Sequence, residues 1–290
     1  MMSSVGVMLF KALSKLPLPI LYGVSTFVYL IVYYIAGYRR NTAYKNLQNS
    51  FPDKSEAELQ QLAKQFYRNL SDITLESVKS ISIQQSELER RVKFTNPEVL
   101  NECFEQDQSV ILMTMHQCNW EWLLLAASAK LPKPVAAIYK PLHNPKIDVL
   151  MREIRSRFGA ELIPAKQTMV EVMRRKKEGP HCLAIVADQL PGQDEETYWA
   201  HFLNQDTAFA VGTEKVAKIA RAPVFFVKMV RTGRGFYEVT LEKMVEPPYP
   251  KKSYFLIEKY VEMSEQHILQ YPSDWLWSYR KWKYKKPLYA

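Results

Sequence analysis

One short segment of the chain holds residues whose types and spacing suit acid–base chemistry. His116 and Glu121 lie five residues apart in the sequence His-Gln-Cys-Asn-Trp-Glu. On one continuous helix this spacing would separate the two side chains by about 140° around the axis, and they would not meet. A strand that ends at His116, followed by a turn and a new helix, removes this obstacle. An imidazole held by a carboxylate is suited to accept a proton from an alcohol, because the unperturbed pKa of imidazole lies near neutrality and the carboxylate fixes its tautomer.

The residues around His116 predict that arrangement. Val110 to Met115 is an apolar run without polar alternation, which is typical of a strand buried on both faces of a sheet. Asn119 is a favourable N-cap for a helix from Trp120 to Lys130, and Glu121 would lie in its first turn, where the helix dipole favours a carboxylate. From local pattern alone, a core histidine beside a first-turn glutamate is the alternative interpretation.

A second apolar run ends in polar residues in the same way. Cys182 to Ala187 predicts a buried strand that is followed by Asp188 and Gln189. Because ligands of open α/β sheets bind at the carboxyl ends of strands, we expect these two residues to share a crevice with His116. An aspartate that merely caps a loop is the alternative.

Two arginines and a glycine are candidates for binding an anionic group. Arg155 and Arg157 lie at the end of a predicted helix, and guanidinium groups bind phosphate through two parallel hydrogen bonds. Gly212 precedes another predicted helix, whose first N–H groups can approach an anion. A solvated basic helix face is the alternative for the arginines.

The motif at His116 resembles the His-x4-Asp/Glu motif of the lysophospholipid acyltransferase superfamily, in the branch of the late, lauroyl/myristoyl-type acyltransferases of lipid A biosynthesis. The resemblance extends from about residue 40 to 285 with its motifs in matching order. These include Tyr-Lys-Pro from Tyr139, Arg-Ser-Arg-Phe-Gly from Arg155, Asp188-Gln189 and a tryptophan-rich ending from Trp275. Lys140 departs from the arginine that is usual in the family.

The resemblance implies an α/β fold of the acyltransferase type, a sandwich with a mixed central sheet flanked by helices. It implies an O-acyltransferase that moves a fatty acyl chain from an acyl thioester, on acyl carrier protein or coenzyme A, to a hydroxyl of a lipid A precursor. In that family His116 would be the general base, and Glu121 would orient the imidazole. No serine occupies the place of an enzyme nucleophile, which fits direct transfer without an acyl-enzyme.

The resemblance also assigns the remaining candidate residues. Arg157, with Arg155 as the second choice, would engage the phosphorylated substrate. Asp188 and Gln189 would belong to the substrate site, where the aspartate would orient an arginine or the acceptor, and Gly212 would belong to the segment that closes the acyl groove.

Composition restricts the class of protein. The 290 residues are 47% hydrophobic, enough for a full core, and the three cysteines are too few for a disulfide framework or a zinc site. No metal or other cofactor is expected. The net charge of +9 suits an acidic carrier protein or an anionic lipid surface, and no nucleic-acid-binding motif accompanies it.

The amino-terminal region predicts attachment to a membrane. Residues 1–19 have apolar residues at helical spacing and predict an amphipathic interfacial helix. Residues 20–38 carry no charge and approach the length of a membrane span, and Arg39 and Arg40 follow at once. We therefore expect a transmembrane or anchoring helix, with a monotopic hairpin and a buried helix as alternatives. Residues 39–290 would form one catalytic domain on the cytoplasmic face of the inner membrane.

Further elements follow from apolar periodicity and turn signals. A capping-box pattern at Ser55 and Glu58 predicts a helix to about Ser80, and residues 92–94 and 135–139 predict strands. Thr-Gly-Arg-Gly between 224–230 and 236–241 predicts a hairpin. The aromatic ending suits either a membrane interface or simple packing.

Two other functions remain open at this stage. An acyltransferase that acts on a lysophospholipid or an amino-acid lipid would carry the same motifs. A non-catalytic lipid-binding membrane protein could keep the fold, although intact His116, Glu121 and Asp188 argue against it.

Overall fold

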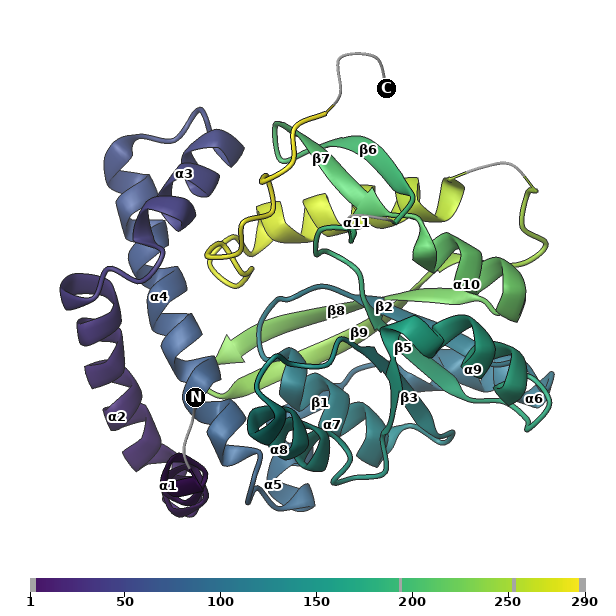
Figure 1. The fold of residues 1–290 in the computed structure, drawn as a ribbon, viewed down its shortest axis with the longest axis horizontal. Helices are drawn as coiled ribbons and strands as arrows, with labels where there is room; N and C mark the ends of the chain where they lie inside the picture. The colour runs from purple at the N-terminus through teal and green to yellow at the C-terminus, as the bar shows by residue number, and fades with distance from the viewer. Residues whose placement is uncertain (1–3, 193–194, 252–253, 287–290) are drawn as a thin grey trace.

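The apolar strands assemble into one mixed sheet with helices on both faces (Figure 1). The computed structural model describes residues 4–192, 195–251 and 254–286. Within this part of the chain, the seven-stranded sheet has the order β1-β9-β8-β2-β5-β3-β4, and β6 pairs with β7 in a separate antiparallel hairpin. The strands are β1 (Val92–Phe94), β2 (Val110–Thr114), β3 (Val135–Tyr139), β4 (Glu161–Pro164), β5 (Cys182–Val186), β6 (Thr197–Phe202), β7 (Gln205–Ala210), β8 (Val224–Gly233) and β9 (Phe236–Val245).

The sheet is parallel except where the predicted hairpin joins it. β8 and β9 run antiparallel, whereas β9 is parallel to β1 and the strands from β8 to β4 are parallel to one another. The mixed α/β architecture that the resemblance implied is confirmed. β4, β6 and β7 were not anticipated as strands, because their residues show little apolar periodicity.

Helices connect most of these strands. The α-helices are α1 (Ser4–Ser14), α2 (Leu18–Leu30), α3 (Arg40–Ser50), α4 (Glu56–Lys79), α5 (Gln85–Arg91), α6 (Asn101–Glu105), α7 (Trp120–Lys130), α8 (Pro145–Arg155), α9 (Thr168–Arg175), α10 (Gly212–Ala220) and α11 (Phe255–Gln270). A π-helical turn, η1 (Ile31–Ile35), extends α2, and short 3-10 helices are η2 (Pro97–Leu100) and η3 (Ala165–Gln167). α5, α7 and α8 cover one face of the sheet, and α9, α10 and α11 cover the other (Figure 1).

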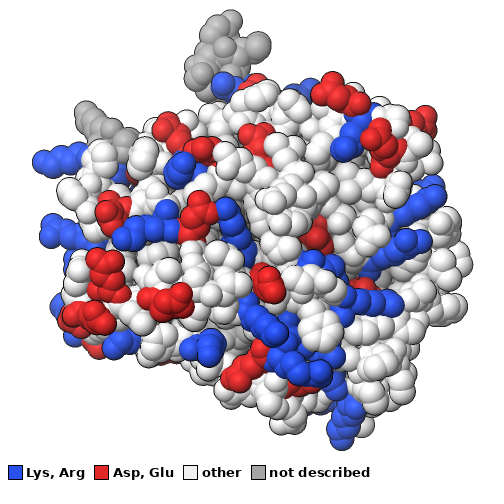
Figure 2. Space-filling model, turned by 180° about the vertical axis from the view of Figure 1, so that it is seen from behind, with Lys and Arg blue, Asp and Glu red and all other residues white. Residues whose placement is uncertain are grey.

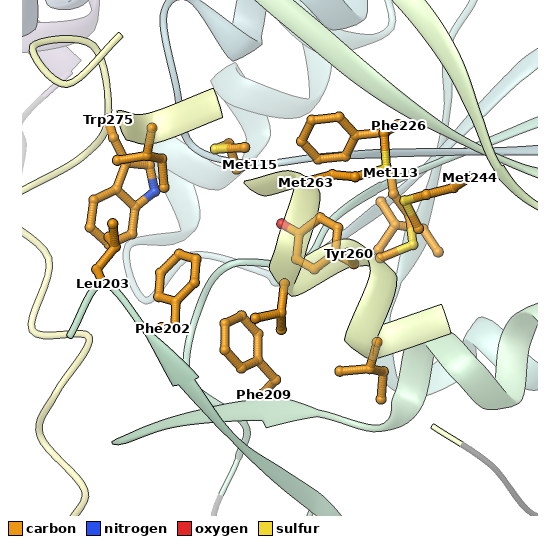
Figure 3. Close-up of a cluster of buried hydrophobic side chains, with 14 of the residues drawn as sticks. Met113, Met115, Phe202, Leu203, Phe209, Phe226, Met244, Tyr260, Met263 and Trp275 are labelled. Atoms are coloured by element: carbon orange, nitrogen blue, oxygen red, sulfur yellow. The ribbon is translucent and has the colours of Figure 1, made fainter. Parts of the chain in front are cut away.

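β2 lies at the centre of the sheet and is buried on both faces, as its apolar run predicted. Alternate residues along a strand point to opposite faces. Val110 and Leu112 therefore pack in the core beneath α7, whereas Ile111 and Met113 pack in the core beneath α11. Figure 3 shows the second core, where Met113 lies beside Phe226 of β8 and Met263 of α11, and where Phe209 of the hairpin β6–β7 packs against Tyr260 of α11. His116, two residues after the end of β2, therefore follows a strand that is packed on both faces.

The long helix α4 joins the amino-terminal helices to the rest of the fold. Its start is the predicted capping box, in which the Ser55 backbone N–H donates to Glu58 Oε2 at 2.8 Å and the Glu58 N–H donates to Ser55 Oγ at 3.4 Å. α2 packs along α4 and buries Leu18, Leu21 and Tyr29.

The other side of α2 is exposed and apolar. Phe27 is 63% exposed and Ile35, at the end of η1, is 80% exposed. Among the described residues, Leu18–Ile35 is the one helix that is long and apolar enough to cross a membrane, and a third of it is buried in the protein. Length and composition alone support a span here, so membrane insertion stays a prediction. The first three residues of the predicted interfacial helix 1–19 lie outside the described residues.

Candidate active site

The imidazole of His116 is held by Asp188. β2 and β5 are parallel neighbours with Thr114 opposite Val186, so the residues that follow the two strands emerge at the same edge of the sheet. His116 Nδ1 lies 2.7 Å from Asp188 Oδ1, and the His116 backbone N–H donates to Asp188 Oδ2 at 3.0 Å. The two strand ends therefore bring these residues together, and Asp188 contacts the imidazole, whereas the resemblance implied an arginine or the acceptor as its partner.

A tryptophan from the end of the chain completes the setting of Asp188. The Trp275 indole N–H donates to Asp188 Oδ2 at 2.8 Å, and both side chains are buried. Burial alone would raise the pKa of Asp188, but the neighbouring imidazole and the N–H donors of His116 and Trp275 outweigh it, so this pKa lies below its usual value. Asp188 is consequently a carboxylate that can stabilise positive charge on the imidazole.

The other ring nitrogen of His116 faces the open side. His116 Nε2 lies 3.1 Å from Gln189 Nε2, and the Trp120 ring meets the imidazole edge to face at 5.1 Å between centroids. Because Nδ1 donates to a carboxylate, Nε2 is the nitrogen with a free lone pair, which accepts from the Gln189 amide. Nε2 is thus the atom available for proton transfer.

Glu121 does not orient the imidazole, which corrects the expectation drawn from the motif. Its two oxygens accept from Arg155, with Nε–Oε2 at 2.8 Å and Nη2–Oε1 at 2.6 Å. Asn119 caps α7 as predicted, with its Oδ1 accepting from the Trp122 N–H at 2.9 Å, and Glu121 lies in the first turn. From there its side chain turns towards α8, whereas the imidazole turns towards β5.

Arg155, the second choice for the substrate-binding arginine, lines the same cavity as His116. Burial would lower the pKa of Arg155, but its hydrogen bonds to Glu121 and the charge of that carboxylate raise it above the usual value. The guanidinium is therefore a fixed positive charge beside the candidate general base.

Arg157 lies elsewhere, so its expected place at the substrate is corrected. Its Nη1 donates to the Ser80 carbonyl, its Nη2 donates to the Ile83 carbonyl at 2.9 Å, and its guanidinium lies 5.1 Å from the centroid of the Phe158 ring. It is not among the residues that line the cavity. Arg157 instead ties the loop after α8 to the end of α4.

The C-terminal segment, residues 274–282, forms backbone hydrogen bonds with the turn after His116. The Leu276 N–H donates to the His116 carbonyl at 3.1 Å, and the Cys118 N–H donates to the Asp274 carbonyl at 3.0 Å. Cys118 has φ of +50°, a left-handed conformation that is uncommon for residues other than glycine. The segment thus supports both the backbone of the turn and the carboxylate that holds the imidazole.

The same segment reaches the neighbouring loop and the amino-terminal helices. Lys281 Nζ donates to the Gln189 carbonyl at 3.4 Å, and Asn46 on α3 donates to the Trp277 carbonyl at 2.9 Å. Trp275 and Trp277 are buried, which favours packing over a membrane interface for these two residues.

A cavity of about 780 Å³ opens in front of His116, within the usual range for small-molecule sites. Glu121, Gln189 and Gly212 line it together with His116 and Arg155. A Cβ added at Gly212 would meet no atom within 4 Å, so this glycine borders open space and is not required for packing.

Most of the remaining lining is apolar, and one part of it follows the face of the sheet beneath α7. Leu112, Val227, Leu241 and Phe94 come from β2, β8, β9 and β1, which are consecutive strands in the sheet. The cavity therefore combines one polar end, at His116, with a long apolar arm.

Sequence reasoning did not find Trp275 or Trp120 as parts of this site. Trp275 lies 87 residues from the aspartate that it binds, and no spacing signals such a contact. Trp120 is adjacent to the motif glutamate and could have been suspected from that position. Among the described residues, no group of three or more His, Cys, Asp or Glu side chains is arranged to hold a metal ion.

Comparison with known proteins identifies the family. A family described as bacterial lipid A biosynthesis acyltransferase matches residues 1–284. A lipid A biosynthesis acyltransferase of Haemophilus influenzae is 24% identical over 211 residues, which cover 69% of this chain and 63% of that protein. The lipid A biosynthesis palmitoleoyltransferase of Escherichia coli is 22% identical over 270 residues, and its lauroyltransferase is 20% identical over 273 residues; each alignment covers 93% of this chain and 87% of the relative. The chain therefore belongs to the bacterial lipid A biosynthesis acyltransferase family.

Proposed function

We propose that this protein transfers a fatty acyl chain from an acyl thioester to a hydroxyl group of a lipid A precursor, with His116 as the general base. The observation that carries the proposal is the position of His116. Its Nδ1 is engaged by a buried carboxylate and its Nε2 faces a cavity with a long apolar arm. A base beside an apolar cavity is what transfer of a fatty acyl chain to a hydroxyl requires.

The hydrogen bonds of the imidazole define the direction of proton transfer. The bond to Asp188 keeps the proton on Nδ1 and leaves Nε2 as the acceptor. An acceptor hydroxyl would replace the Gln189 amide at Nε2, which now lies at 3.1 Å. Asp188 would then stabilise the imidazolium that forms.

The reaction is a single displacement at the thioester carbonyl. The acceptor oxygen forms a bond to the carbonyl carbon as His116 Nε2 takes the hydroxyl proton. The carbon–sulfur bond then breaks, and the leaving thiolate receives that proton. Among the described residues that line the cavity there is no serine or cysteine, which favours direct transfer over an acyl-enzyme.

Arg155 is the residue that we assign to an anionic group of the substrate. Glu121 holds the guanidinium through Nε and Nη2 and leaves Nη1 for a further acceptor. Gly212 and Thr213, at the start of α10, also line the cavity, and helix N-termini favour negative charge. The motif glutamate would thus act through Arg155, as a positioning residue.

The apolar arm is the place that we assign to the acyl chain. From β2 to β1 it crosses three strand spacings of about 4.8 Å each, or about 14 Å in total. An extended chain advances about 1.2 Å per bond, so the arm has room for a chain of roughly a dozen carbons.

The exposed apolar side of α2, together with α1, would attach the protein to the inner membrane, with the remainder on the cytoplasmic face. The net charge of +9 favours an acidic acyl carrier protein over coenzyme A as the bearer of the thioester, because it attracts a large anionic partner.

Replacing His116 tests the mechanism. General base catalysis typically contributes about 10²–10⁴-fold, so His116→Ala should lose at least about 10²-fold in kcat while the protein stays folded. The measurement is acyl transfer by the purified full chain, with thermal unfolding as the check on folding. His201→Ala, at an exposed position on β6 outside the cavity, should keep wild-type activity. A folded His116→Ala protein with full activity would overturn the mechanism.

The acceptor is tested by mass spectrometry of lipids from a deletion strain. Complementation with the wild type should restore one acyl chain to lipid A, and His116→Ala should not. Unchanged lipid A beside an accumulated lysophospholipid or amino-acid lipid would move the proposal to that acceptor.

A further inference from the structure

A second cavity of about 590 Å³ lies apart from the His116 cavity. It is formed between α2, α4 and the end of the β8–β9 hairpin, and it shares no lining residue with the first cavity. It is lined by Ser25, Thr26, Tyr29, Leu30, Gln65, Arg68, Asn69, Asp72, Arg231, Thr232, Gly233 and Arg234. Three of these residues are arginines: Arg68 comes from α4, and Arg231 and Arg234 come from the β8–β9 hairpin.

The three arginines differ in how many of their guanidinium nitrogens have a hydrogen-bond acceptor. Arg234 donates to both oxygens of Asp72, at 2.9 and 2.6 Å. Arg231 contacts Asp274 through Nε at 3.2 Å, and its guanidinium lies 5.1 Å from the centroid of the Tyr237 ring. Its two terminal nitrogens are buried and have no hydrogen-bond acceptor among the described residues. Guanidinium nitrogens are donors only, so the missing partner is an acceptor.

Arg68 provides the third charge, at the exposed rim of the cavity. It lies 5.3 Å from the centroid of the Tyr29 ring, and within the described residues no carboxylate approaches it within 4 Å. The Tyr29 hydroxyl is buried and likewise has no hydrogen-bond partner among those residues.

The carboxylates around the cavity are already engaged. Asp72 is the one carboxylate among the described lining residues, and it also accepts from Ser25 Oγ at 2.6 Å. Glu76 lies behind Tyr237 and accepts hydrogen bonds from Tyr22, Asn119 and Tyr237. The donors left without acceptors are therefore cationic or hydroxyl groups, a set that suits a phosphate.

The cavity adjoins an apolar surface. Leu30 lines it and is 45% exposed, and Phe27, one residue after the lining residue Thr26, is 63% exposed. Figure 2, seen from behind, shows charged side chains over most of this face and a largely uncharged margin on the side where α1 and α2 lie. A ligand with an anionic head group and apolar tails could place its head group in the arginine-lined cavity and its tails on the exposed apolar side of α2.

We propose that this second cavity binds the phosphate head group of an anionic lipid, whose acyl chains lie along the exposed apolar side of α2. Arg68, Arg231 and the Tyr29 hydroxyl supply donors to the phosphate oxygens. Arg234 is held by Asp72 and closes the far side. The lipid bound here is a ligand of the fold and is not the substrate at His116.

The test uses the full chain in a non-ionic detergent and measures its thermal unfolding. Dioctanoyl phosphatidic acid should raise Tm in a saturable way, because a ligand that binds the folded state stabilises it. Dioctanoylglycerol, which lacks the phosphate, should leave Tm unchanged. Inorganic phosphate at the same concentration should have little effect, and an equal rise with inorganic phosphate would overturn the assignment to a lipid.

Variants locate the binding. Arg68→Gln should weaken the apparent affinity for dioctanoyl phosphatidic acid by about tenfold, the effect of losing one charge-assisted hydrogen bond. Lys64→Gln removes the same charge one turn earlier on α4, outside the cavity lining, and should bind as the wild type does. Unchanged affinity in Arg68→Gln would exclude this cavity.

Two further variants keep the result independent of folding and of catalysis. Arg231→Gln should weaken binding as well, and Arg68→Gln remains the decisive variant if Arg231→Gln does not fold. His116→Ala should retain binding whether or not the protein proves to be an acyltransferase.

Discussion

At the scale of residues, two carboxylates that both stand near His116 in the fold have different tasks. Asp188 contacts the imidazole at 2.7 Å, whereas Glu121 forms a bidentate pair with Arg155. The division follows from where each side chain begins. Asp188 follows a strand that is parallel to the strand of His116, and Glu121 lies on a helix that packs against α8. In the proposed mechanism Asp188 stabilises the protonated imidazole, and Glu121 positions Arg155 for the anionic group of the substrate.

Removing a single hydrogen-bond donor tests whether the bond from Trp275 to Asp188 contributes to catalysis. Trp275→Phe keeps an aromatic ring but deletes the N–H that lies 2.8 Å from Asp188 Oδ2. Hydrogen bonds to charged groups contribute about 1.5–3 kcal/mol, so we expect kcat to fall by roughly 10- to 100-fold while KM for the thioester stays near wild type. Steady-state kinetics with a thioester donor measure both quantities.

Trp282→Phe is the matched control for this prediction. It deletes an indole N–H that donates to Thr207 Oγ1 at 2.8 Å, away from the imidazole. Trp282→Phe should keep kcat near the wild-type value, and a fall in kcat of equal size in both variants would show that Trp275 acts only through packing.

At the scale of elements, two neighbouring arginines illustrate how a helix end separates similar side chains. Arg155 is the last residue of α8 and faces the cavity. Arg157, two residues later and beyond the helix, turns to the carbonyls of Ser80 and Ile83. The basic motif therefore contains one residue assigned to the substrate and one that joins two elements.

Arg157→Ala should consequently affect stability and leave substrate binding unchanged. It leaves two carbonyl groups without a donor, which costs about 1–2 kcal/mol in the free energy of unfolding. Arg155→Ala should instead raise KM, because it removes the assigned substrate charge. Thermal unfolding and steady-state kinetics of both variants check the contrast. A raised KM in Arg157→Ala without a loss of stability would return Arg157 to the substrate.

At the scale of the whole molecule, a buried lysine joins the C-terminal segment to the site and to the β6–β7 hairpin. Lys281 is 1% exposed, donates to the Ala208 carbonyl at 2.9 Å and lies 4.0 Å from the centroid of the Phe209 ring. Burial lowers the pKa of Lys281 from its usual value of 10.5 to about 7, although the charge of Asp188 opposes this.

This depressed pKa predicts how stability depends on pH. Between about pH 7 and 10.5 the unfolded chain binds a proton that the folded chain has released, so the free energy of unfolding rises with pH across this window. Below about pH 7 the cost of burying the charged ammonium is fully present. Lys281→Met removes this dependence, so the wild type should gain stability relative to the variant as pH rises, by at most about 5 kcal/mol over the whole window.

The gain in the free energy of unfolding is measured by denaturant unfolding of the wild type, Lys281→Met and the control Lys283→Met at about pH 7 and about pH 9.5. Lys283→Met, at an exposed position two residues later, should keep a constant difference from the wild type. A constant difference for Lys281→Met as well would mean that Lys281 keeps an ordinary pKa in the fold.

The amino-acid sequence by itself determined the elements that carry the site. The apolar runs before His116 and Asp188 formed parallel neighbouring strands, Asn119 capped the following helix, and Thr-Gly-Arg-Gly formed the hairpin, because these features depend on local periodicity and turn chemistry. The motif order along the chain also indicated the family, which is confirmed.

Only the tertiary structure decided which charged groups meet. The choice of Asp188 over Glu121 as the partner of His116, and of Arg155 over Arg157 at the cavity, depends on how β5, α4 and α8 pack around the turn. The contact between Trp275 and Asp188 joins residues 87 apart in the chain. Local patterns contain no information on such contacts, because the packing of distant segments fixes the direction in which each side chain points.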